Sequence, residues 1–163
     1  MNQFQFAEGL KVLPILAPAD ITTTATGTQY VDVSKMHWAS FVVQFGNLNN
    51  STGTVTVEAS TAGSSNATEA AIPFKYRLTS AVATDSLGAI TSASSAGVAI
   101  AAADDNKTLI IEVDPAALPA NPGADYKYLR VVVTPATDNT NYLVGAVAYL
   151  QPRYPGNSIA SAT

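Results

Sequence analysis

The chain has 163 residues, the length of one ordinary domain, and only 12% of them are charged, with a formal net charge of −4. No cluster of Lys and Arg is interleaved with aromatic residues, so we expect no nucleic-acid partner, because phosphate binding lacks its main source of affinity. The absence of cysteine excludes disulfides and thiolate chemistry, and no apolar run approaches the roughly 18 residues of a membrane helix, so no membrane partner is expected.

Residues 1–27 are predicted to form an extended N-terminal arm rather than part of the core. Pro14 and Pro18 interrupt the segment and disfavour a regular helix or a central strand. Its apolar side chains are nevertheless too numerous to leave in water, and they include Phe4, Phe6, Leu13 and Ile15. We therefore expect the arm to dock on a neighbouring chain of a homo-oligomer or on a larger assembly.

Two strands joined as a hairpin are predicted next. WASFVVQF, residues 38–45, alternates, so that one face carries Ala39, Phe41, Val43 and Phe45. The turn-rich NLNNSTG follows, and then TVTVEA, residues 54–59, alternates in the same way. Each strand therefore turns one apolar face toward a core.

Three later segments continue the pattern. KTLIIEV, residues 107–113, alternates and is ended by the proline-rich DPAALPANPG. YKYLRVVVTP, residues 126–135, also alternates, whereas YLVGAVAYLQP, residues 142–152, is apolar on both faces, as in a strand buried between layers or at a subunit contact. We expect one shared core that contains Phe41, Val43, Val55, Val57, Ile111, Val131 and Val133.

Shorter candidates, TQYVDV, AIPFKYRL and GVAIAA, bring the total to about eight strands at the spacing of a sandwich. We predict an all-β fold: a single antiparallel β-sandwich, jelly-roll-like, over residues 28–151. The spacing does not distinguish a jelly roll from an immunoglobulin-like strand order, because the two differ in how strands cross between sheets. Residues 152–163, PRYPGNSIASAT, are small, polar and unpatterned, and are predicted to be a C-terminal tail.

The chemical inventory gives no catalytic site. His37 is the single histidine, and no GxSxG motif surrounds a serine, so a Ser-His-Asp triad is not expected. The pairs Asp104 with Asp105 and Glu112 with Asp114 are interpreted as solvated loop acids, although glycoside hydrolysis needs only two carboxylates at the right separation. One histidine and no cysteine offer few metal ligands, and no GxGxxG or P-loop motif indicates a cofactor. We therefore predict no enzymatic activity, no metal and no cofactor.

His37 and Trp38 stand side by side at the start of a predicted strand. The favoured interpretation is structural: the indole seals one end of the sandwich and the imidazole forms a hydrogen bond at its rim. Trp38 also fits a binding surface, because Trp and Tyr are enriched in interface hot spots. The other candidates for that surface are Tyr128, Tyr149 and Tyr154.

Several segments share a layout over about residues 20–154: the Thr-rich lead ITTTATGTQYVDV, NNSTGTVTV, the DPAALPA loop, LRVVVTP and the closing YLVGAVAYLQPRY. This layout resembles that of small virion structural proteins of tailed bacteriophages, and above all the jelly-roll decoration, or cement, proteins of the head. The resemblance implies a non-enzymatic protein on the outer surface of the capsid. It would bind the major capsid protein across capsomer junctions, often as a trimer, and stabilise the shell against the pressure of the DNA.

Two other functions remain open. A carbohydrate-binding module or a glycan-processing enzyme on the same sandwich would need exposed aromatic residues in a row and usually a pair of carboxylates. A phage tail, fibre or baseplate accessory protein would share the composition of this chain.

Overall fold

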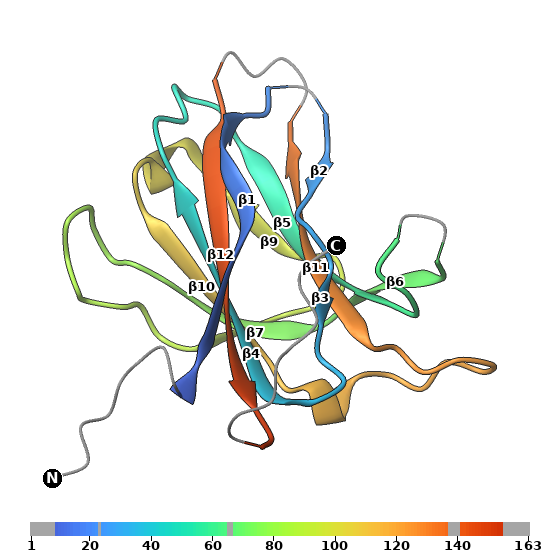
Figure 1. The fold of residues 1–163 in the computed structure, drawn as a ribbon. Helices are drawn as coiled ribbons and strands as arrows, with labels where there is room; N and C mark the ends of the chain where they lie inside the picture. The colour runs from blue at the N-terminus through green and yellow to red at the C-terminus, as the bar shows by residue number, and fades with distance from the viewer. Residues whose placement is uncertain (1–8, 23, 65–66, 137–140, 155–163) are drawn as a thin grey trace, which may run out of the picture.

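The computed structural model describes residues 9–22, 24–64, 67–136 and 141–154, which form two antiparallel β-sheets packed as a sandwich (Figure 1). The first sheet has the order β1 (Lys11–Asp20), β12 (Leu143–Pro152), β4 (Met36–Phe45), β10 (Thr108–Val113), β7 (Phe74–Leu78), β8 (Thr91–Ala93). The second has the order β2 (Thr26–Gly27), β11 (Tyr128–Pro135), β5 (Gly53–Ser60), β6 (Glu69–Ile72). In addition, β3 (Val31–Asp32) pairs with β11, and β9 (Val98–Ile100) pairs with β5. The prediction of an all-β sandwich is confirmed.

The pairing of the strands is that of a jelly roll. Eight of them, β1, β3, β4, β5, β6, β10, β11 and β12, pair first with last, second with seventh, third with sixth and fourth with fifth. This is a long hairpin folded over, so that the chain passes from one sheet to the other. Twelve strands occur in the described part of the chain instead of the predicted eight, because β2, β7, β8 and β9 are short additions to this arrangement.

The core lies between the two sheets and is built by alternation. Phe41 on β4 lies opposite Ile111 on β10, and Val57 on β5 lies opposite Val131 on β11. The seven residues predicted to share one core, Phe41, Val43, Val55, Val57, Ile111, Val131 and Val133, are all fully buried in a single cluster. The period-two pattern therefore identified the inward faces correctly.

The N-terminal boundary of the sandwich was predicted wrongly. β1 pairs along its length with β12, and Ile15 is only 2% exposed within the core of its own chain. Pro14 and Pro18 are accommodated because β1 is the edge strand of its sheet, where one side of the backbone has no partner strand among the described residues. The ladder also shifts register between Pro14 and Leu16, and again between Leu16 and Ala19. β1 and β2 thus contribute two strand pairings to the sandwich, with β12 and with β11, and Phe4 and Phe6 lie outside the described residues.

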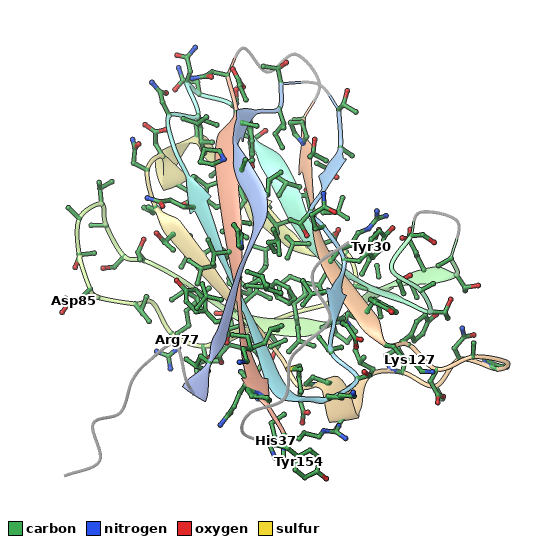
Figure 2. All side chains as sticks on the ribbon, viewed as in Figure 1. Tyr30, His37, Arg77, Asp85, Lys127 and Tyr154 are labelled. Atoms are coloured by element: carbon green, nitrogen blue, oxygen red, sulfur yellow. The ribbon has the colours of Figure 1, made fainter. Side chains whose placement is uncertain are left out.

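The C-terminal boundary is close to the prediction. β12 ends at Pro152, and the next residue, Arg153, is still attached to the sandwich. Its backbone N–H donates to the Lys35 carbonyl at 2.9 Å, and its Nε donates to the Met36 carbonyl at 3.0 Å. Tyr154 follows at the same end of the molecule as His37 (Figure 2). Residues 155–163, the rest of the predicted tail, lie outside the described part.

Two short 3₁₀ helices lie in the connections: η1 (Ala102–Asp104) before β10 and η2 (Pro115–Ala117) after it. Both use acids of the carboxylate pairs considered above. Asp104 Oδ2 accepts from the Ala101 N–H at 2.9 Å, and Asp114 Oδ1 accepts from the Ala116 N–H at 2.9 Å. These acids therefore fix turns of the backbone, which is more specific than the solvated role expected of them.

Candidate binding surface

The outer face of the first sheet carries a row of apolar side chains across four strands. Pro14 on β1 lies opposite Val147 on β12, Val147 lies opposite Val42 on β4, and Val42 lies opposite Ile110 on β10. The row continues to Arg77 on β7, where it becomes charged. Since side chains alternate across a strand, these positions point away from the core that lies beneath β4 and β12.

The apolar part of this face is hollowed. A groove of ≈ 590 Å³ runs over β1, β12 and the C-terminal half of β4. Leu143, which is 37% exposed, stands in its wall. Gly145 keeps the floor open, because a Cβ atom there would come within 3.3 Å of the Pro18 ring. We define the apolar face by the groove residues Pro14, Leu16, Val42, Leu143, Val147 and Tyr149.

A second hollow, of ≈ 500 Å³, lies at the other end of the same sheet, beside η2. Trp38 of β4 lines it together with Lys75 of β7, Ser92 of β8 and Glu112 of β10. Its floor is formed by buried apolar residues, namely Ile72, Phe74, Ala93 and Val113. We call this hollow the Trp38 cleft. It combines an apolar floor with a polar rim, as small-molecule sites generally do.

The outer face of the second sheet is different, because an ionic network lies on part of it. Arg130 on β11 contacts Glu58 on β5 through Nε at 2.7 Å, and Glu69 on β6 through Nη2 at 2.8 Å. The Tyr30 hydroxyl donates to the other carboxylate oxygen of Glu69, and the guanidinium lies 4.8 Å from the Tyr30 ring centroid. The network links four segments of the chain and leaves the side of the sandwich around Tyr30 polar (Figure 2).

This environment perturbs Tyr30. Burial of the phenol raises its pKa to about 12, and the hydrogen bond to Glu69 acts in the same direction because it holds the proton. The nearby positive charge of Arg130 opposes the change. The sequence analysis did not identify this network. Its available signal was one acid and one base at outward positions of two predicted strands, Glu58 and Arg130, but the pairing of those strands was not known from the sequence.

The aromatic and apolar residues proposed for an interface are divided by the fold. Trp38 and Tyr149 share the outer face of the first sheet, where Tyr149 lies opposite Ser40, two residues from Trp38. Tyr128 lies on the second sheet, opposite Ser60, and Tyr154 is 67% exposed beyond β12. A single row of these four aromatics does not form.

The two remaining candidates within the described residues, Leu13 and Ile15, lie on β1. Leu13 is partly buried and packs against the core. The prediction of Ile15 as an interface residue is wrong, because its side chain fills the space between the sheets of its own chain. The sequence pattern did not distinguish a core residue from an interface residue at this position, because both roles require an apolar side chain.

The single histidine, which was considered and rejected as a catalytic residue, can be placed on the structure. His37 is exposed on β4, next to the half-buried Trp38. Among the described residues no group of three or more His, Cys, Asp or Glu side chains is placed to hold a metal ion. No helix in the same residues is long and apolar enough to cross a membrane. Comparison of the chain with protein-family models, curated proteins and solved structures gave no match.

Proposed function

We propose that this chain is a non-enzymatic structural protein of a bacteriophage virion, which binds the outer surface of the head and stabilises the shell. The observation that carries the proposal is the apolar row across β1, β12, β4 and β10 on an outer sheet face. A contiguous apolar patch on an outer surface is typical of a site that contacts another protein. The jelly-roll strand order also agrees with the resemblance to decoration proteins, because viral capsid proteins commonly use this fold.

The partner assigned to the apolar face is the major capsid protein. Covering apolar surface contributes about 25 cal/mol per Å² removed from water. Association itself costs about 4–15 kcal/mol, so a single face gives only a modest net affinity. A homotrimer that engages three sites at once gains affinity through effective concentration, and a trimer is the oligomer that we assign to the protein.

The test is cosedimentation of the purified protein with heads of the phage whose genome encodes it. Val147→Glu places a charge in the middle of the apolar face and should weaken head binding at least tenfold, because the carboxylate would have to be desolvated. Thr134→Glu is the matched control. Thr134 is exposed and lies opposite Thr54, on the outer face of the second sheet, so this variant should bind as the parent does.

Equal binding of the Val147→Glu and parent proteins would remove the apolar face from the proposal. Failure of the parent to sediment with heads would remove the head as its location. Gene neighbourhood separates the phage interpretation from others, because terminase, portal and capsid reading frames should lie near the gene. Antibody labelling of virions then distinguishes the head from a tail, fibre or baseplate position.

A carbohydrate-binding role is the second candidate function, and one observation favours it. The Trp38 cleft places an indole and the two carboxylates of Glu112 and Asp114 around one hollow. The sequence-based requirement for several exposed aromatic residues in a row is not met, since Tyr128 and Trp38 lie on different sheets.

A further inference from the structure

The Trp38 cleft has a polar side that follows from strand register. Glu112 on β10 lies opposite Ser40 on β4 and opposite Lys75 on β7, and Lys75 lies opposite Ser92 on β8. One row of the sheet therefore presents a hydroxyl, a carboxylate, an ammonium group and a second hydroxyl, and the last three, from Glu112, Lys75 and Ser92, line the cleft. The row borders the indole of Trp38, which stands two residues before Ser40 on the same face of β4.

The two charged groups of this row are available to a ligand. Lys75 and Glu112 are cross-strand neighbours of opposite charge, yet neither forms an ion pair with any other described residue. By contrast, Arg130 on the other sheet forms ion pairs with both Glu58 and Glu69. Asp114, at the rim of the cleft, uses one oxygen to accept from Ala116. The cleft thus holds unpaired donors and acceptors beside an apolar wall.

The chemistry of the rim selects the class of ligand. A simple anion would meet the carboxylates of Glu112 and Asp114, and a simple cation would meet the ammonium group of Lys75. A neutral sugar avoids both conflicts, because its hydroxyls donate to carboxylates and accept from ammonium and hydroxyl groups. The flat indole offers an apolar surface to the C–H face of a pyranose ring.

We infer that the Trp38 cleft is a binding subsite for a neutral glycan. The inference does not depend on attachment to a phage head, since the cleft and the apolar groove have no lining residue in common. It assigns Trp38 to stacking, Glu112 to accepting hydroxyl protons and Lys75 to donating. On a virion, such a site would give the particle an affinity for polysaccharide.

Affinity electrophoresis of the full chain through native gels tests this inference. The gels contain one of four neutral polysaccharides, namely starch, mannan, dextran or hydroxyethylcellulose, or one of two acidic ones, alginate or polygalacturonate. We expect retardation by at least one neutral polymer. Trp38→Ala should weaken the binding constant at least tenfold, and the isosteric Glu112→Gln should weaken it several-fold while leaving the cleft shape unchanged. Tyr154→Ala removes an exposed aromatic residue outside the cleft and is the matched control.

Three results would overturn the inference: no retardation by any neutral polymer, retardation by acidic polymers alone, or equal retardation of the parent and both cleft variants. Circular dichroism checks that Trp38→Ala is folded, and if it is not, Glu112→Gln decides. The outcome is separable from that of the proposed function. Val147→Glu should keep its retardation in the gels, and Glu112→Gln should keep its binding to heads.

Discussion

Arg130 illustrates how single residues define the two outer faces of this sandwich. Its guanidinium pairs with Glu58 and Glu69 and lies over the ring of Tyr30. An arginine whose charge is offset by two carboxylates in this way stabilises the sheet and offers little unpaired charge to a ligand. On the opposite face, Glu112 and Lys75 face each other without pairing with a described side chain. Charged residues therefore stabilise the sheet on one face, whereas on the other face they can form hydrogen bonds with a ligand.

Tyr30 should make stability fall at alkaline pH. Because the pKa of Tyr30 is about 12 in the folded chain and 10.0 ordinarily, the unfolded chain loses this proton first. The stability that Tyr30 contributes is complete below about pH 10 and is lost as the pH rises toward about 12. Urea unfolding at a series of alkaline pH values should show a smaller decline for Tyr30→Phe than for the parent. Tyr154→Phe, an exposed control, should decline as the parent does; equal declines for all three would contradict the assignment.

Phe41 should be among the most destabilising positions for truncation. Its ring is fully buried opposite Ile111, so Phe41→Ala removes contacts with both sheets and should cost about 3–5 kcal/mol of unfolding free energy. The adjacent Val42 points to the outer face, and Val42→Ala should cost less than about 1 kcal/mol. Urea melts followed by circular dichroism compare the two. Similar losses at both positions would mean that the assignment of inner and outer faces is wrong.

At the scale of elements, β1 determines where the domain begins. The strand covers β12, whose other neighbour is β4, and carries Ile15 into the core. Without β1, the backbone of β12 would become an exposed sheet edge, which is prone to pair with other chains. The prolines of β1 are compatible with its edge position, and they also limit strand addition on the outer side, because proline donates no backbone hydrogen bond.

Deletion of residues 1–18 should therefore destabilise the sandwich, contrary to the arm expected from the sequence. The deletion removes most of β1 and the side chain of Ile15, for which truncation alone costs about 2–5 kcal/mol. Deletion of residues 1–8 leaves every described strand intact and is the matched control. Urea unfolding followed by Trp38 fluorescence measures both. A midpoint unchanged by the longer deletion would restore the arm interpretation.

The whole molecule is a sandwich with two unlike outer faces. The first sheet presents the apolar face and the Trp38 cleft, whereas the second is covered around Arg130 by charged and hydroxyl groups. Only 12% of the residues are charged, so long-range electrostatic steering contributes little to association. Contact through the apolar face therefore depends on burial of apolar surface.

Binding to heads should accordingly be nearly independent of salt. Screening weakens contacts between exposed charges, but it leaves the burial of apolar surface almost unchanged. Between about 50 mM and about 500 mM NaCl, the affinity in cosedimentation should change by less than about threefold. The control is Thr134→Lys, which adds a charge on the opposite face and should follow the same curve. A loss of tenfold or more in salt would show that charged contacts carry the binding.

Much of the fold could be predicted because alternation is a local property of the chain. In residues 38–45 and 54–59 each inward position is apolar, and the buried residues coincide with that pattern. Such segments must bury one face whatever their partner, so the sequence by itself determined the all-β class, the sandwich and its core. Alternation also put Trp38 on the face opposite Phe41, whereas Tyr149 was only a candidate for a binding surface.

Tertiary structure decided what depends on pairing between distant segments. Ile15 becomes a core residue only because β1 lies beside β12, more than 120 residues later in the chain, and Glu112 meets Lys75 only through the register of β10 and β7. Register has no local signature when both outward faces carry mixed residues, because it is set by packing of the whole sheet. The same reason separates Tyr128 from Trp38: two similar aromatic positions reached different sheets through the crossovers of the jelly roll.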